Sequence, residues 1–124
     1  MTTDTESKYI LVVDDQMGVR RLLYEAFNEQ GYQVGLAANG PEALDKINER
    51  WPDVILMDMK MPGMSGLEVL RALKERPGDP KVILMTAYGE LEIVAEAMAL
   101  GVTEYVTKPF DINEVRELVR KVIQ

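Results

Sequence analysis

The chain has 124 residues, 47% of them apolar, which is enough for one domain with a single core and too few for two. Its 21 acidic and 14 basic residues give a net charge of -7, a balance that does not favour nucleic acid as a direct partner. The absence of cysteine and histidine excludes disulfides, thiolate or imidazole metal sites and catalysis by either side chain. Any chemistry must therefore use carboxylates, hydroxyls and lysines.

The first eight residues, MTTDTESK, are polar and match neither a secretory signal nor a transit peptide. We expect a disordered tail over residues 1–8 and one domain over residues 9–124. Apolar runs reach only four or five residues, far short of the roughly 20 that span a bilayer, so no membrane partner is expected. Together with the lack of cysteine, this predicts a cytoplasmic location.

Short apolar runs typical of β-strands alternate five times with stretches of helical periodicity. The expected strands are residues 9–13, 33–38, 53–57, 81–85 and 103–107. Two helices are expected to begin with capping boxes, formed by Ser65 with Glu68 and by Asp111 with Glu114. The apolar face of the fourth helix is expected to comprise Leu91, Val94, Ala95 and Met98.

This alternation predicts an α/β fold with a five-stranded parallel sheet, because a strand followed by a helix crosses over to a parallel neighbour. The economical arrangement is a doubly wound (βα)5 sandwich of three layers. The order of the strands is not specified. In such sheets ligands bind beyond the carboxyl ends of the strands, so the residues just past each strand are the candidate site.

Polar side chains follow four of the five expected strands. Asp14 and Asp15 follow the first, Asp58 the third, Thr86 the fourth and Lys108 the fifth. Converging carboxylates repel one another by about 4 kcal/mol per pair at about 4 Å and an effective dielectric near 20. A raised pKa, a nearby lysine or a hard divalent cation would offset this, and an all-oxygen ligand set favours Mg²⁺ over zinc or copper.

Each of these residues also has a simpler role on its own. Aspartate and threonine commonly cap helices, and Lys-Pro is an ordinary turn dipeptide. The joint pattern favours a site, because an acid pair, a single acid, a hydroxyl and a lysine fall at the same end of different strands.

Residues 8–124 resemble the receiver domain of bacterial two-component response regulators. The likeness rests on Asp14-Asp15, on Asp58 followed by MPGMSG at 61–66, on Thr86-Ala87 and on Lys108-Pro109. It implies a flavodoxin-like, CheY-like sandwich that accepts a phosphoryl group from a phosphohistidine onto Asp58 in a Mg²⁺-dependent reaction. The implied partners are a sensor histidine kinase and a histidine phosphotransferase with a four-helix phosphohistidine domain.

The resemblance also implies the metal ligands. Asp15 and Asp58 would bind Mg²⁺ directly, Asp14 would act through water, and Lys60 would contribute its backbone carbonyl. The chain would be a phosphoacceptor intermediate rather than an enzyme of multiple turnover.

Three further residues have implied roles at the phosphoryl group. Lys108 would pair with one phosphoryl oxygen, and Thr86 would donate its hydroxyl to another. Thr86 and Tyr105 would then form a switch in which the aromatic ring turns inward. The alternative for Tyr105 is a sheet residue that packs on the preceding helix with its hydroxyl in water.

A partner-binding surface is expected beside the site. Its residues are Gln16, Met17, Val19, Pro109 and Phe110. The Lys108-Pro109 bond is a candidate cis peptide, as in the family. Ordinary core packing is the alternative for the apolar members, above all for Val19.

A finer resemblance rests on DDQ at 14–16, DMK at 58–60, TAYGEL at 86–91 and KPFD at 108–111. These stretches are similar to the single-domain phosphotransfer regulator of the sporulation phosphorelay, which would make the chain an intermediate carrier. TAYG and KPFD also resemble receivers of nitrogen-regulator-type transcription activators. Because the last expected helix reaches the C-terminus, we expect no output domain. The alternatives are an excised receiver of such an activator and a chemotaxis-type stand-alone regulator.

Two other classes of protein share parts of this pattern. A haloacid-dehalogenase-type phosphatase also uses an aspartyl phosphate, but it needs an acid two residues after the nucleophile, where Lys60 stands. A flavodoxin-like cofactor binder needs a phosphate loop rich in Ser, Thr and Gly, and Asp14-Asp15 would repel a phosphate without a bridging cation.

Overall fold

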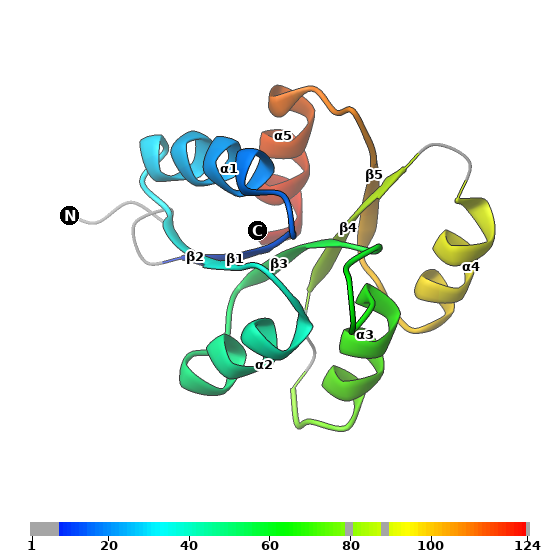
Figure 1. Ribbon diagram of the computed structural model, residues 1–124. Helices are drawn as coiled ribbons and strands as arrows, with labels where there is room; N and C mark the ends of the chain where they lie inside the picture. The colour runs from blue at the N-terminus through cyan, green and yellow to red at the C-terminus, as the bar shows by residue number, and fades with distance from the viewer. Residues whose placement is uncertain (1–7, 79–80, 88–89, 124) are drawn as a thin grey trace.

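The computed structural model describes residues 8–78, 81–87 and 90–123 (Figure 1). The expected tail over residues 1–8 therefore lies outside the described residues except for Lys8, and so do Tyr88 and Gly89 of the TAYGEL stretch. In the ranges that are described, no helix combines the length and apolar character needed to cross a membrane.

Strands and helices alternate along the described chain as the sequence predicts. The strands are β1 (Tyr9–Val13), β2 (Gln33–Ala37), β3 (Val54–Asp58), β4 (Val82–Ala87) and β5 (Glu104–Lys108). The helices are α1 (Met17–Glu29), α2 (Gly40–Glu49), α3 (Gly66–Lys74), α4 (Leu91–Ala99) and α5 (Ile112–Ile123). The predicted (βα)5 alternation is thus confirmed.

The five strands form one parallel sheet in the order β2-β1-β3-β4-β5. The order reverses between β1 and β3, which are direct neighbours with Val13 beside Met57. The residues that follow β1 and end β3 consequently lie at the topological switch point, where sheets of this kind bind ligands.

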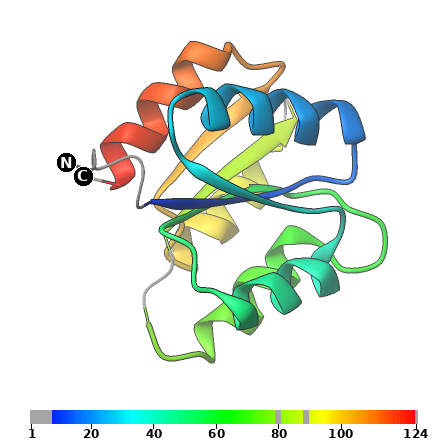
Figure 2. The same cartoon turned by 90° about the vertical axis from the view of Figure 1, so that its left-hand side faces the viewer.

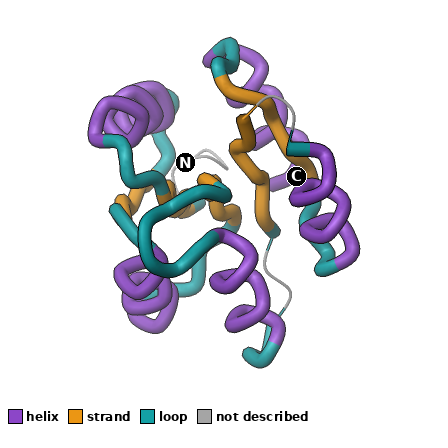
Figure 3. The backbone as a smooth tube through the Cα atoms, turned by 45° about the vertical axis from the view of Figure 1, so that its right-hand side comes forward, coloured by secondary structure: helices purple, strands orange, loops and turns teal. Residues whose placement is uncertain are grey.

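Helices cover both faces of the sheet. Figure 2 shows α1 and α5 on one side of the sheet and α2 and α3 on the other, and Figure 3 shows helices flanking the strands on both sides. Successive residues of β1 alternate between two cores, with Leu11 under α2 and α3 and Ile10 under α1 and α5. Burial on both faces explains why the central strands are continuously apolar.

Three strands end later than the sequence predicts. Asp58, Thr86 and Lys108 were expected just past their strands, and the structure places each within the last two residues of β3, β4 or β5. Strand hydrogen bonding continues past the apolar run that defined each predicted strand. The sheet itself therefore fixes the backbone of these three residues.

The two predicted capping boxes have different outcomes. The Ser65 hydroxyl accepts from the Glu68 N–H, and the Glu68 carboxylate accepts from the Ser65 N–H, which confirms the first box. At α5 the Asp111 carboxylate accepts from the Asn113 N–H at 2.8 Å, while the Glu114 N–H donates to the Asp111 carbonyl. Asp111 thus caps the helix through a different donor from the one predicted.

The apolar face predicted for α4 is not the face that packs on the sheet. Val94 is buried, but Leu91 and Met98 are 74% and 45% exposed and Ala95 is also exposed, whereas Ala97 is fully buried. The helix is apolar on more than one side, so periodicity alone does not identify the side that packs on the sheet.

Candidate functional site

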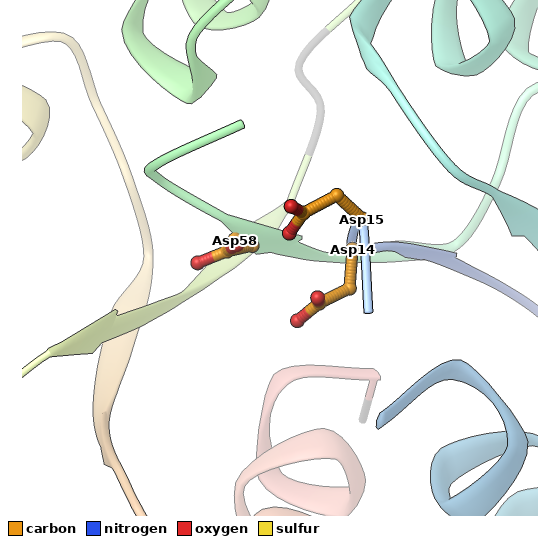
Figure 4. A group of neighbouring side chains, drawn as sticks. All are labelled: Asp14, Asp15 and Asp58. Atoms are coloured by element: carbon orange, nitrogen blue, oxygen red, sulfur yellow. The ribbon is translucent and has the colours of Figure 1, made fainter. Parts of the chain in front are cut away.

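Three carboxylates meet at the carboxyl edge of the sheet. Asp14 and Asp15 follow β1 and Asp58 ends β3, and each offers an oxygen within 4.8 Å of those of the other two (Figure 4). The pairing of β1 with β3 at the switch point brings the two strand ends together. The structure therefore places side by side the three acids that the strand-end pattern singled out.

Lys108 joins this cluster from β5. Its Nζ lies 2.7 Å from Asp14 Oδ2 and 3.4 Å from Asp58 Oδ1. Burial lowers the pKa of Lys108, but the hydrogen bond and charge of Asp14 and the charge of Asp58 outweigh this and raise the pKa overall. The ammonium group is therefore a fixed positive charge between two carboxylates. The Lys108-Pro109 peptide bond is cis, as expected.

Asp58 is 8% exposed, and its environment disfavours the charged form. Burial first, and then the charge of Asp14, raise the pKa of Asp58 from 3.8 to about 6, although Lys108 opposes the shift. Asp15 adds a smaller repulsion. Added positive charge at this position would therefore be favourable.

The two oxygens of Asp14 are already engaged. Oδ1 accepts the Gln16 N–H at 2.8 Å, Oδ2 accepts from Lys108, and the side chain is fully buried. The Asp14 carbonyl accepts from the Arg20 guanidinium at 2.7 Å, which braces the turn before α1. Asp15 is exposed. The carboxylates with room for a cation are therefore those of Asp15 and Asp58.

These donors suit a hard divalent cation. They are carboxylate oxygens, which is the ligand type that Mg²⁺ prefers. Lys60 lies two residues after Asp58, and its side chain is 70% exposed, with Nζ 3.5 Å from Glu90 Oε2. The Lys60 ammonium is thus paired with Glu90, and the backbone carbonyl of Lys60 is its candidate metal ligand.

Thr86 and Tyr105 line one cleft on the α4 side of the sheet. Thr86 is 2% exposed in β4, whereas Tyr105 in β5 is 44% exposed. The cleft has a volume of about 290 Å³ and is also lined by Glu90, Leu91 and Val94. The two residues expected to form a switch therefore share a space that is open to solvent.

The expected partner-binding residues lie at the starts of α1 and α5, two helices on the same face of the sheet (Figure 1). Gln16, Met17 and Pro109 are exposed, Met17 by 71%. Val19 and Phe110 are partly buried and pack on the core beneath these helices. The structure thus gives the last two both core contacts and some exposed surface.

The sequence does not predict the contacts of three residues near the site. Arg20 holds the Asp14 carbonyl, and Gly66 donates its N–H to the Met59 carbonyl at 3.0 Å. Glu90 has a side chain only 8% exposed, and its Oε1 accepts the Ala87 N–H at 2.6 Å. Glu90 belongs to the TAYGEL stretch, so the resemblance pointed to its position but not to its contacts.

The chain matches the family model of the response regulator receiver domain over residues 10–120. It is 51% identical over 112 residues to sporulation initiation phosphotransferase F of Bacillus subtilis, covering 90% of each chain. It is 44% identical to regulatory protein AtoC of Escherichia coli, covering 93% of this chain and 25% of that protein.

Solved structures agree with the fold. The chemotaxis response regulator CheY4 of Vibrio cholerae superposes with a TM-score of 0.86 at 30% identity, covering 93% of this chain and 98% of that one. Receiver domains bind Mg²⁺ at an acidic cluster, and such a cluster is present here. The chain belongs to the response regulator receiver domain family.

Proposed function

We propose that this chain is a phosphoacceptor response regulator in which Asp58 receives the phosphoryl group of a partner's phosphohistidine. The observation that carries the proposal is the meeting of Asp14, Asp15 and Asp58 within 4.8 Å, with Lys108 paired to two of them. The acids can hold a divalent cation, and such a cation together with the Lys108 ammonium would supply the neutralisation of charge that phosphoryl transfer requires.

In the transfer, one Asp58 carboxylate oxygen attacks the phosphorus atom in line with the bond to the histidine nitrogen. The O–P bond forms as the N–P bond breaks, and the departing imidazole nitrogen keeps the bonding electron pair and takes a proton from solvent. The product is an acyl phosphate on Asp58. Lys108 is close enough to Asp58 to pair with a phosphoryl oxygen.

Asp15, Asp58 and the Lys60 carbonyl are the proposed Mg²⁺ ligands, with Asp14 acting through water. The engagement of both Asp14 oxygens by Gln16 and Lys108 supports this indirect role. When bound, Mg²⁺ supplies neutralisation of the charge on the phosphoryl oxygens. Asp14 then serves chiefly to fix Lys108.

Thr86 is proposed to donate its hydroxyl to the phosphoryl group, and Tyr105 to turn into the space beside it. The shared cleft of about 290 Å³ supports this pairing, because it offers room next to the buried threonine. Phosphorylation would change the conformation of the surface around α4 and β5. The size of this population shift is set by how much more favourably one conformation accommodates the phosphoryl group than the other.

The proposed docking surface for a histidine phosphotransferase consists of Gln16, Met17, Val19, Pro109 and Phe110. Exposed Met17 at the start of α1 and partly buried Phe110 just before α5 support it. Identity of 51% with a sporulation phosphotransferase over 90% of both chains favours a relay role over that of a receiver in a transcription activator. We place the receiver domain at residues 9–124.

A labelling experiment tests the proposal. With Mg²⁺ and acetyl phosphate as a small phosphodonor, the wild type should acquire an acid-stable, alkali-labile phosphate, and Asp58→Ala should acquire none. Undiminished labelling of Asp58→Ala would overturn the assignment. Mixing the labelled protein with a histidine phosphotransferase should move the label to that partner if the chain is a relay carrier.

A further inference from the structure

Glu90 is a buried carboxylate to which the proposed function gives no role. Its side chain is 8% exposed, and it lies directly before α4. Oε1 accepts the Ala87 N–H at 2.6 Å, while Oε2 accepts no hydrogen bond from the described residues and is paired only with Lys60 Nζ at 3.5 Å. Burying a carboxylate with so few donors costs stability, which raises the question of what role this arrangement could serve at the neighbouring site.

The Ala87 N–H that Glu90 occupies faces the strand that carries Asp58. Met85 pairs with Asp58 in the register of β3 and β4, and the Met85 carbonyl accepts from the Met59 N–H. Backbone polar groups point to alternate neighbours along a strand, so Ala87, two residues after Met85, directs its N–H to the β3 side as well. This donor therefore points to the region just beyond Asp58.

The second group that Glu90 holds is the Lys60 ammonium, which belongs to a residue close to Asp58 in the sequence. Lys60 lies two residues after Asp58, and its 70% exposed side chain reaches across to Glu90 from the loop after β3. One carboxylate thus links the loop after β3 to the end of β4. Both donors that it holds, a backbone N–H and an ammonium, are groups that bind phosphoryl oxygens.

We infer that Glu90 is a positioning residue that competes with the phosphoryl group on Asp58 for the Ala87 N–H and the Lys60 ammonium. In the unphosphorylated chain Glu90 holds both donors in place. When Asp58 carries a phosphoryl group, the phosphoryl oxygens take these donors and Glu90 is released. The inference rests on the proposed function. It adds that the Glu90 carboxylate lowers the affinity of the site for the phosphoryl group.

The test measures the affinity for beryllofluoride, a stable mimic of the phosphoryl group, in saturating Mg²⁺. Glu90→Ala removes the competing carboxylate, and Glu90→Asp keeps the charge but shortens its reach. Both should bind beryllofluoride about fivefold more tightly than the wild type, the factor that corresponds to the net contribution of about one hydrogen bond. Glu92→Ala removes an exposed acid from the first turn of α4 and should leave the affinity unchanged.

Hydrogen exchange of the Ala87 amide tests the contact itself. Without beryllofluoride, the amide should exchange faster in Glu90→Ala and Glu90→Asp than in the wild type. With beryllofluoride bound, protection should return in every variant, because the mimic replaces the carboxylate. A residue with only a structural role would lower the stability and would not strengthen binding.

The outcomes separate this inference from the proposed function. If the wild type does not bind beryllofluoride, or Asp58→Ala binds it equally well, the proposed function fails. If the wild type binds beryllofluoride and the Glu90 variants bind it equally well or more weakly, only the role of Glu90 is refuted. If Glu90→Asp matches the wild type while Glu90→Ala binds more tightly, a charge effect at a distance replaces competition for the two donors, and the inference is again refuted.

Discussion

At the level of single residues, Asp58 carries an ionisation cost that Lys108 offsets only in part. Burial and the charge of Asp14 raise the pKa of Asp58 to about 6, so the folded chain binds this proton more tightly than the unfolded chain does. The contribution of Asp58 to the free energy of unfolding therefore falls as the pH rises from about 4 to about 6. Above that range the folded protein bears the full cost of the charge.

We expect Asp58→Asn to be more stable than the wild type at pH 7.5 in EDTA, by about 3 kcal/mol, since one pKa unit corresponds to about 1.4 kcal/mol. The gain should shrink as the pH falls through about 6 and vanish below about 4. Urea denaturation at several pH values measures it. Asp45→Asn, at an exposed position of α2, is the control and should change little. A gain that is independent of pH would contradict the account.

Lys108 is the counterion of the fully buried Asp14, so its removal leaves that carboxylate with one hydrogen bond. We expect Lys108→Ala to lower the free energy of unfolding by about 2 kcal/mol, below the usual cost of breaking a fully buried pair because Lys108 is 22% exposed. Mg²⁺ binding should persist. Lys121→Ala breaks an exposed pair with Glu104 and should cost under about 1 kcal/mol. Equal losses in the two variants would be inconsistent with the proposed electrostatics.

At the level of elements, the turn from β3 into α3 fixes Asp58 through a close backbone approach. A Cβ atom on Gly66 would lie 2.9 Å from the Asp58 carbonyl oxygen and 3.0 Å from Met59 Cα. Backbone atoms held by the sheet cannot yield as a flexible side chain would. Gly66 therefore allows the start of α3 to pack against the end of the strand that carries Asp58.

We expect Gly66→Ala to lower the free energy of unfolding by about 1–3 kcal/mol, the usual cost of overpacking, and to slow phosphorylation of Asp58. Gly18→Ala is the matched control, because a Cβ atom there meets nothing within 4 Å and alanine favours the helix by up to about 1 kcal/mol. Thermal unfolding compares the two. Gly66→Ala with unchanged stability and labelling would show that the close approach is not required.

The sequence predicts the elements well where burial is unambiguous and poorly where it is not. The unbroken apolar runs of β1, β3 and β4 identify strands covered on both faces, and Ser65 marks the start of α3 by its capping chemistry. The buried face of α4 was mispredicted because apolar residues lie on more than one side of that helix. The ends of β3, β4 and β5 were placed too early because polar residues such as Asp58 continue the hydrogen bonding of the sheet.

The candidate site likewise has one part that the sequence predicts and one part that it does not. Its acids and lysine stand at strand ends, which a parallel sheet must bring to one edge, so their meeting follows from local pattern and topology. Arg20, Gly66 and Glu90 act through contacts that depend on how loops fold back on the sheet. Their spacing in the sequence carries no sign of those contacts.

At the level of the whole molecule, a metal ion bound at the acidic edge would stabilise the folded chain. The carboxylates come from the ends of two neighbouring strands, so a cation shared between them binds only the folded chain. Ligands that bind only the folded state stabilise it by about 2.7 kcal/mol at a hundred times the dissociation constant.

Mg²⁺ should therefore raise the free energy of unfolding of the wild type by about that amount at a hundredfold excess over its dissociation constant. Asp15→Ala should retain the metal-free stability, because Asp15 is exposed, and should lose most of the gain from Mg²⁺. Asp45→Ala, with an equal loss of charge, should keep the gain. Urea denaturation with NaCl at matched ionic strength separates binding from screening. Equal gains in both variants would argue against Asp15 as a ligand.

The central claim is that Asp58, among the acids gathered at this edge, becomes the acyl phosphate. Borohydride reduction of the phosphorylated protein converts an aspartyl phosphate into homoserine, and peptide mass spectrometry then locates the modified position. The account predicts homoserine at position 58 of the wild type. Homoserine at position 14 or 15, or its absence from a fully labelled protein, would contradict it.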